Sequence, residues 1–403
     1  MEFRRSSKLA RVSYEIRRPG IDYADQLEQA GHQVFRLNIG NPALFGFEVP
    51  EEILRDMIRD LPVAHTYTDS RGLLSARLAV VQHYRDRGLA DVDVDDVFLG
   101  NGVSELLTMA TAALLEDGDE VLIPAPDYPL WTSATHLAGG RAVHYMCDEA
   151  AGWLPDLADM AAKVTDRTRA VLIINPHNPT GAVYPREVLD GILDLARRHH
   201  LVVFADEIYD QILYDDAVHH SAGALASDVL CLTFSGLSKA YRVGGFRSGW
   251  MVISGPKRHA KDYIEGLDAL AGLRMCPNVP GQYAILAALG GRPSIAGLVL
   301  PGGRLHEQRD YAWQKLNEIP GVSCVKPRGA LYAFPRLDPA VYKIHDDGRF
   351  AFDLLLREQV QVIQGTGFHW PRPDHFRILT LPDVGYLDAA IGRIGRFLDG
   401  YRQ

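Results

Sequence analysis

The sequence predicts an α/β fold: a large domain with a mostly parallel, helix-covered sheet, and a smaller α/β domain beside it. Helix-like segments, such as 104–115 and 186–199, lie between several short apolar runs, and this alternation is typical of parallel strands beneath helices. A chain of 403 residues is also long enough for two domains. The apolar runs are residues 97–99, 121–123, 171–174, 201–205, 229–234 and 250–253.

The pattern changes after about residue 290, which predicts the domain boundary. Glycine and proline interrupt the chain there, and a polar helix candidate and short strands near 329–334 and 376–380 follow. The first forty-odd residues end in the loop Asn38-Ile-Gly-Asn-Pro42 and either join the smaller domain or cover the active site. We assign 46–290 to the large domain, and 1–45 with 291–403 to the smaller one.

Composition narrows the class of protein. Hydrophobic residues make up 47% of the chain and charged residues 23%, with a formal net charge of −9. This acidic balance gives no reason to expect a nucleic-acid partner. We find no apolar stretch long enough to cross a bilayer and no leader-like segment at the arginine-rich start, so we expect a cytoplasmic protein that acts on small molecules.

Cysteine spacing predicts neither a disulfide framework nor a metal site. The chain has four cysteines, which lie far apart without a C-x-x-C pair. We expect buried thiols in a reducing compartment. The four are Cys147, Cys231, Cys276 and Cys324.

Lys239 is the first candidate catalytic residue. It follows the apolar run 229–234, has small neighbours and stands eight positions before Arg247. Partial loss of solvation at a strand end lowers the pKa of an amine and makes it a better nucleophile toward a carbonyl. Taken alone, a solvated surface lysine is the more common outcome.

Two polar residues follow other apolar runs. Asp206 ends the run 201–205, where a buried carboxylate is costly unless a cation pairs with it; a helix N-cap is the alternative role. Asn178 lies in Asn175-Pro-His-Asn178-Pro-Thr-Gly181, whose prolines and glycine stiffen a turn and fix the direction of the asparagine.

A glycine-rich helix start at Gly100-Asn-Gly102-Val103-Ser104-Glu could hold a phosphate with free backbone N–H groups, although such starts are common. Arg377, in a short strand candidate of the smaller domain, could bind a carboxylate with two parallel hydrogen bonds.

In order and spacing, these motifs resemble the class I/II, fold-type I aminotransferases that use pyridoxal 5′-phosphate (PLP), over nearly the whole chain. The resemblance implies that Lys239 forms a Schiff base with PLP and shuttles the proton. It implies that Asp206 keeps the ring nitrogen protonated and that Tyr209 bonds the ring oxygen. Asn178 would contact both cofactor and substrate, and Arg377 the substrate carboxylate.

The same resemblance assigns the remaining contacts. Arg247 would bind the cofactor phosphate with the helix start, and Tyr128 would stack on the ring. Gly236 stands where many members carry a phosphate-binding hydroxyl, so Ser235 or Ser238 would supply it, and we assign Ser238. Tyr67 would reach the phosphate of the neighbouring subunit, which implies a homodimer with shared active sites. The cofactor contacts are then Gly102, Val103, Ser104, Tyr128, Asn178, Asp206, Tyr209, Ser238, Lys239, Arg247 and Tyr67.

Further stretches resemble the bacterial glutamate–pyruvate (alanine) aminotransferase subgroup: 275–280, 301–305 and 321–332. The implied reaction is L-alanine plus 2-oxoglutarate to pyruvate plus L-glutamate, by a ping-pong mechanism on amino acids and 2-oxo acids. Gly40 would close over the substrate, and Tyr14 and Arg17 are candidate substrate contacts that could equally be surface residues.

Besides a more distant PLP-dependent lyase, decarboxylase or synthase on the same scaffold, two alternatives remain open at this point. An aminotransferase of the same family that acts on aspartate or another amino acid is the nearer one, because residues that choose the substrate scatter along the chain. A PLP-sensing regulator is the other, and it would need a DNA-binding region before the 38–42 loop, where we find no such features.

Overall fold

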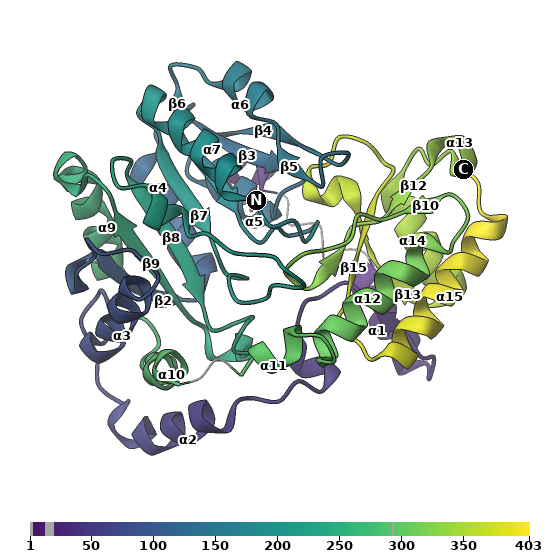
Figure 1. The fold of residues 1–403 in the computed structure, drawn as a ribbon, viewed down its shortest axis with the longest axis horizontal. Helices are drawn as coiled ribbons and strands as arrows, with labels where there is room; N and C mark the ends of the chain where they lie inside the picture. The colour runs from purple at the N-terminus through teal and green to yellow at the C-terminus, as the bar shows by residue number, and fades with distance from the viewer. Residues whose placement is uncertain (1–2, 13–19, 292–293) are drawn as a thin grey trace.

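An eight-stranded sheet dominates the computed structural model, which describes residues 3–12, 20–291 and 294–403 (Figure 1). Its strand order is β2-β9-β8-β7-β6-β3-β4-β5. The strands are β2 (Val97–Asn101), β3 (Glu120–Ala125), β4 (Arg141–Asp148), β5 (Leu154–Pro155), β6 (Thr168–Ile174), β7 (Val202–Asp206), β8 (Cys231–Gly236) and β9 (Ser248–Ser254).

The centre of this sheet is parallel. β4, β3, β6, β7 and β8 run in one direction, whereas β9 is antiparallel to both β8 and β2, and β5 is antiparallel to β4. The predicted mostly parallel, helix-covered sheet is therefore confirmed. All six apolar runs of the sequence overlap strands of this sheet, but the reversed direction of β9 could not be read from its composition.

Alternate side chains along a central strand belong to two hydrophobic cores, one on each face of the sheet. In β6, Leu172 and Ile174 pack with residues of α4, α5 and α9, while Val171 and Ile173 pack with residues of α6, α7 and α8. Both faces are covered, which is why the strands are almost wholly apolar. The helices are α4 (Val103–Leu114), α5 (Pro129–Leu137), α6 (Leu157–Lys163), α7 (Arg186–His199), α8 (Ala222–Leu225) and α9 (Lys261–Leu273).

Three further helices pack together beside β2 and β9: α2 (Glu51–Asp60), α3 (Leu74–Arg85) and α10 (Val279–Gly290). Short 3₁₀ turns join the elements around the sheet. They are η3 (Pro42–Phe45), η4 (Leu61–Val63), η5 (Val94–Asp96), η6 (Gly244–Phe246) and η7 (Lys257–His259).

The C-terminal part builds a separate core from short strands and long helices (Figure 1). β15 (Phe376–Leu379) pairs antiparallel with β11 (Tyr332–Ala333) and β14 (Ile363–Gln364), and β10 (Val322–Ser323) pairs with β12 (Arg336–Leu337). The remaining elements of this part are α11 (Ala296–Val299), α12 (Arg304–Asn317), α13 (Pro339–Tyr342), α14 (Asp347–Glu358), η8 (Gly365–Phe368) and α15 (Val384–Gly400).

The N-terminal segment contacts both parts. β1 (Phe35–Arg36) pairs parallel with β13 (Val360–Gln361), and α1 (Gly20–Gln29) contacts α14, whereas η1 (Ser7–Arg11) contacts α5. The strand pairing is consistent with a smaller domain built from both termini; the boundaries at residues 45 and 290 stay a prediction.

Chain direction places the polar residues of the motifs together. Because parallel strands end at the same edge of a sheet, the segments that follow β3, β6, β7 and β8 meet there. The antiparallel β9 lets β2 end at that edge too. Among the described residues, no helix has the length and apolar character needed to span a bilayer.

Candidate active site

A cavity of about 630 Å³ opens at the carboxyl ends of these strands. Its walls combine the ends of β6 and β7, the turn after β8, the start of α4 and the segment 38–42, with Tyr332, Ile363 and Arg377 from the C-terminal part. Predicted site residues that line it are Gly40, Val103, Ser104, Tyr128, Asn178, Asp206, Tyr209, Ser238, Lys239, Arg247 and Arg377.

Lys239 lies in the turn that follows β8, with its side chain partly buried. Its Nζ donates a hydrogen bond to the backbone oxygen of Gly40 at 2.8 Å. A neutral carbonyl can hold an ammonium group in place without forming a salt bridge that substrate would have to break. The amine therefore lies oriented on the cavity wall, which suits a group that reacts with a carbonyl.

Asp206 ends β7 as a buried carboxylate. The indole Nε1 of Trp131, from α5, donates to its Oδ2 at 2.9 Å. Burial raises the pKa of Asp206 to about 6, and the hydrogen bond from Trp131 opposes that rise. A carboxylate kept at this cost on a cavity wall is well placed to pair with a cation that enters the cavity.

Two buried tyrosines meet between Lys239 and Arg377. The hydroxyl groups of Tyr209 and Tyr332 lie 2.7 Å apart. Burial raises the pKa of Tyr209 well above its usual value. For Tyr332 burial acts in the same direction, but the charges of Lys239 and Arg377 outweigh it and the pKa falls. Tyr332 is therefore the better proton donor of the pair.

The guanidinium group of Arg377 packs against two aromatic rings. Its guanidinium carbon lies 4.3 Å from the ring centroid of Tyr332 and 4.7 Å from that of Phe368. Nη1 donates to Oδ1 of Asn178 at 3.0 Å, and Nη2 donates to the backbone oxygen of Asn38. These contacts fix the guanidinium plane, as two-pronged binding of a carboxylate requires.

The start of α4 and Arg247 form a candidate anion site. Arg247 Nη2 donates to Ser104 Oγ at 3.2 Å and to the backbone oxygen of Asn101 at 3.1 Å. Gly102, the N-cap, has φ of 80°, and a Cβ there would lie 2.3 Å from Nη2 of Arg247. Both observations require glycine. The guanidinium thus lies against free N–H groups at a helix N-terminus, where anions bind.

The structure also separates the two candidate serines. Ser235 is buried, and its hydroxyl donates to the backbone oxygen of Glu207 at 3.4 Å. Ser238 lines the cavity beside Arg247. Of the two hydroxyls, that of Ser238 is the one available to a bound anion.

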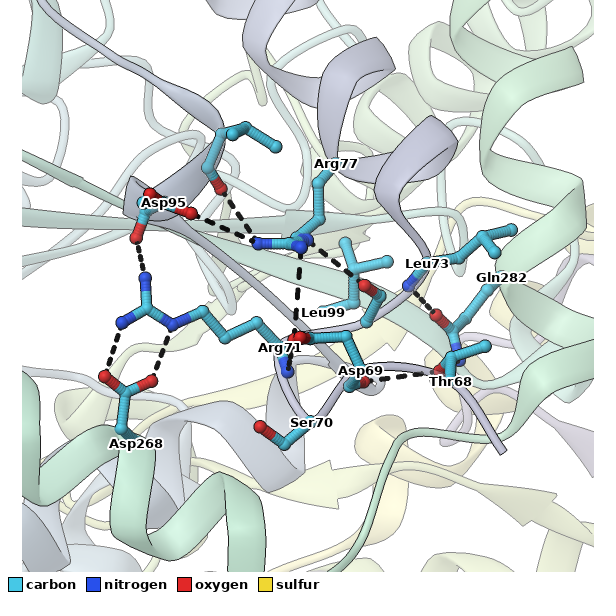
Figure 2. Close-up of polar contacts among 12 residues, drawn as sticks. Thr68, Asp69, Ser70, Arg71, Leu73, Arg77, Asp95, Leu99, Asp268 and Gln282 are labelled. Atoms are coloured by element: carbon cyan, nitrogen blue, oxygen red, sulfur yellow. Dashed lines mark hydrogen bonds and ion pairs between the residues drawn. The ribbon is translucent and has the colours of Figure 1, made fainter. Parts of the chain in front are cut away.

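Tyr67 lies apart from the cavity of its own chain, with 79% of its surface exposed. The loop that follows it is braced (Figure 2). Arg71 donates through Nε and Nη2 to the two carboxylate oxygens of Asp268, and Gln282 accepts from Leu73 N at 2.5 Å and donates to Thr68 Oγ1 at 3.4 Å. An exposed aromatic residue next to so rigid a loop is suited to contact another molecule.

Of the other N-terminal candidates, the structure describes Gly40 but not Tyr14 or Arg17. Gly40 lies on the cavity wall, where Lys239 bonds its carbonyl. Tyr14 and Arg17 fall outside the described residues, so their proposed substrate contacts stay predictions.

Comparison with known proteins agrees with this geometry. A family model described as "Aminotransferase class I and II" matches residues 32–394. The chain belongs to this family. It is 59% identical to glutamate-pyruvate aminotransferase AlaA of Escherichia coli K12 over 99% of this chain and 98% of that protein. It is 62% identical to an alanine aminotransferase of Mycobacterium tuberculosis H37Rv, over 100% of this chain and 94% of that one.

The fold of this chain also matches that of a solved aminotransferase structure. The crystal structure of an Escherichia coli aminotransferase matches with a TM-score of 0.99 and 59% identity, covering 100% of both chains. The predicted family is thus confirmed, together with its α/β fold.

Two site residues of this family member were not found from the sequence. Trp131 is the third residue of α5, and its N–H reaches Asp206 across 75 positions of chain. Tyr332 lies in Gly329-Ala-Leu-Tyr332, a stretch noticed only for its likeness to a subgroup. The one local signal in either case is the polar group of the aromatic side chain, an indole N–H or a phenol hydroxyl, which needs a hydrogen-bond partner when it is buried.

Gly40→Ala should disturb the site through Tyr332. Its Cβ would lie 2.5 Å from Tyr332 Oη and 3.2 Å from Cζ. We expect a loss of about 1–3 kcal/mol in stability, with reduced activity. Adding Tyr332→Phe removes the nearer atom, so the double variant should recover part of the unfolding temperature lost by Gly40→Ala.

The control is Gly272→Ala, where a Cβ meets nothing within 4 Å. A double variant whose loss equals the sum of the two single losses would show that the glycine and the tyrosine do not interact.

Proposed function

We propose that this chain is a PLP-dependent alanine aminotransferase that converts L-alanine and 2-oxoglutarate into pyruvate and L-glutamate. One observation carries the proposal: the Lys239 amine, the buried Asp206 carboxylate and the Arg377 guanidinium line one cavity, although they come from three separate segments. The relatives at 59% and 62% identity are named for glutamate–pyruvate and alanine transamination, which favours alanine over other donors.

The residues present fit the cofactor. The buried Asp206 carboxylate accepts hydrogen bonds from two N–H groups, the indole of Trp131 and the backbone of Ile208, and it lies on the cavity wall where a ring N–H⁺ could pair with it. The helix start with Arg247 and Ser238 suits a phosphate, and the absence of a Cβ at Gly102 lets the Arg247 guanidinium lie against that helix start. Tyr128 would cover the ring face, and Tyr209 with Asn178 would bond the ring oxygen.

When bound, PLP supplies an aldehyde that condenses with amines and a cationic ring that accepts electrons from the α-carbon of the amino acid. The chain supplies the remaining functions. Asp206 would keep the proton on the ring nitrogen, and the indole of Trp131 helps Asp206 to stay ionised at neutral pH. Arg377 orients the substrate carboxylate, which fixes the direction of the Cα–H bond.

Lys239 moves the proton. Lys239 lines the same cavity as Asp206, so its amine would hold the cofactor aldehyde and would act as the base and acid that moves the α-proton of the substrate. Its hydrogen bond to Gly40 gives the amine a resting position beside the segment that covers the substrate. The segment 38–42 also bonds Arg377 through Asn38, so one loop touches both the proton carrier and the carboxylate site.

We further propose a homodimer in which Tyr67 completes the partner's phosphate site. Its support is the exposure of Tyr67, the braced loop beside it, and exposed apolar side chains on the neighbouring elements. These include Ile58, Leu61 and Val63. The cytoplasmic location expected from the sequence stays a prediction.

The half-reactions test the proposal. L-alanine should shift the absorption band of the bound cofactor, and 2-oxoglutarate should restore it. Lys239→Ala should fold and bind PLP but lose at least about 100-fold in transamination. A band that responds to L-aspartate and not to L-alanine would favour an aspartate aminotransferase, and turnover retained by Lys239→Ala would exclude this lysine.

Arg377→Lys should raise KM for L-alanine by roughly 10- to 100-fold because one ammonium replaces a two-pronged contact. Steady-state kinetics measure the change. Arg372→Lys is the matched control, since Arg372 lies five positions earlier, is half exposed and pairs with Asp374. An unchanged KM in Arg377→Lys would mean that another group binds the carboxylate.

Mixing two impaired variants tests the shared site. Lys239→Ala keeps Tyr67, and Tyr67→Ala keeps Lys239, so each mixed dimer would contain one native site. Random reassociation should restore about a quarter of wild-type activity at low PLP concentration. Activity no higher than that of Tyr67→Ala alone would place Tyr67 outside the active site.

A further inference from the structure

A second cluster of titratable side chains lies outside the cavity lining. Asp127 stands two residues after β3, His144 lies within β4, and His369 directly follows η8. In the sequence, His144 and His369 are separated by more than half of the chain, so no motif spacing links them. The fold brings one ligand atom of each residue within 4.8 Å of the others.

The cluster has a defined geometry. Asp127 Oδ1 lies 2.8 Å from His369 Nδ1, and Asp127 Oδ2 lies 3.5 Å from His144 Nε2. The two imidazole rings stack, with centroids 4.7 Å apart and planes 21° from parallel. The carboxylate is fully buried, while the His144 and His369 side chains are 23% and 30% exposed. The cluster is therefore closed on the carboxylate side and open to solvent on the imidazole side.

We propose that Asp127, His144 and His369 bind a divalent transition metal of the zinc type. Zinc prefers imidazole nitrogen and carboxylate oxygen at about 2.0–2.2 Å, so tetrahedral ligand atoms lie about 3.3 Å apart. The separations of 2.8 Å (Oδ1 to His369 Nδ1) and 3.5 Å (Oδ2 to His144 Nε2) lie near this value, and one ligand atom of each residue lies within 4.8 Å of the others. Because the rings stack, one imidazole must turn out of the stack so that both nitrogens face the ion. Solvent would supply the fourth ligand.

A buried carboxylate needs a positive partner. The Asp127 side chain is fully buried, and the loss of its hydration is costly unless cations or hydrogen-bond donors surround the carboxylate. A divalent cation beside its oxygens would supply that charge directly.

The hydroxyl group of Thr132 lies within hydrogen-bond distance of two of the proposed metal ligands. Thr132 Oγ1 lies 2.5 Å from Asp127 Oδ2 and 3.0 Å from His144 Nε2. It can go on donating to the carboxylate while His144 turns its nitrogen to the ion. Such outer hydrogen bonds orient metal ligands in proteins.

The site joins segments that also form the cavity. Tyr128 follows Asp127, and the Asp127 N–H donates to the backbone oxygen of Phe368 at 2.8 Å. Phe368 is the residue whose ring packs on Arg377. A bound ion would therefore fasten the Tyr128 loop to the turn beneath Arg377, and it should stabilise the folded chain.

Metal binding can be measured without turnover, so the result is independent of the proposed transamination. Tag-free holoenzyme in a non-chelating buffer is titrated with Co²⁺, whose four-coordinate complexes absorb at longer wavelength than the cofactor. We expect saturation at one ion per chain, displacement by Zn²⁺, and a rise of about 3 °C in unfolding temperature with saturating Zn²⁺.

Variants locate the ion. His369→Asn removes one imidazole but leaves an amide N–H for Asp127, and His144→Gln removes the other. Each should weaken Co²⁺ binding at least tenfold and abolish the temperature rise. His200→Asn is the matched control, because His200 is exposed and shares the left-handed backbone of His369, with φ of 54° against 55°. It should bind Co²⁺ like the wild type.

Two results would overturn the proposal. The first is wild-type holoenzyme that shows no saturable Co²⁺ band and no temperature rise with Zn²⁺. The second is binding that persists unchanged in His144→Gln and His369→Asn. If either variant fails to fold, the wild-type titration still decides the matter, because a cluster held by hydrogen bonds alone gives no cobalt spectrum.

Discussion

The buried carboxylate of Asp206 is the constraint around which the site is organised. A carboxylate at the end of β7 loses solvation, which is costly, and burial raises the pKa of Asp206 to about 6 despite the hydrogen bonds that oppose the rise. Trp131, in helix α5 on one face of the sheet, reduces that cost with one hydrogen bond. The carboxyl edge of a parallel sheet is where such a group can face a ligand, since strand ends leave a crevice there. Lys239, Asn178 and Tyr128 share that edge for the same topological reason.

The cavity depends equally on contacts between distant parts of the chain. The 38–42 segment bonds Lys239 through Gly40 and Arg377 through Asn38, so the amine and the guanidinium are held by one loop. Tyr332 reinforces this link, since its hydroxyl meets Tyr209 while its ring covers Arg377. Neither part of the fold contains a complete site by itself.

Sequence reasoning succeeded where local pattern and chemistry coincide. Short apolar runs predicted six strands of the large sheet because buried parallel strands are apolar on both faces, and segments that follow several of these runs line the cavity. It failed for groups whose role depends on a distant contact. Nothing near Trp131 signals a bond to Asp206, and nothing near His369 signals His144 or Asp127. The direction of β9 was also beyond reach, because a buried antiparallel strand has the same composition as a parallel one.

The pairing of β1 with β13 has a consequence for synthesis. Phe35 lies opposite Val360, so 325 further residues must be made before the first strand meets its partner. At roughly 5–20 residues per second, that interval is about 15–65 s on the ribosome. During it the large sheet can form, while the segment that will hold Lys239 and Arg377 still lacks its neighbour. The nascent enzyme therefore acquires a working site late, when translation is almost finished.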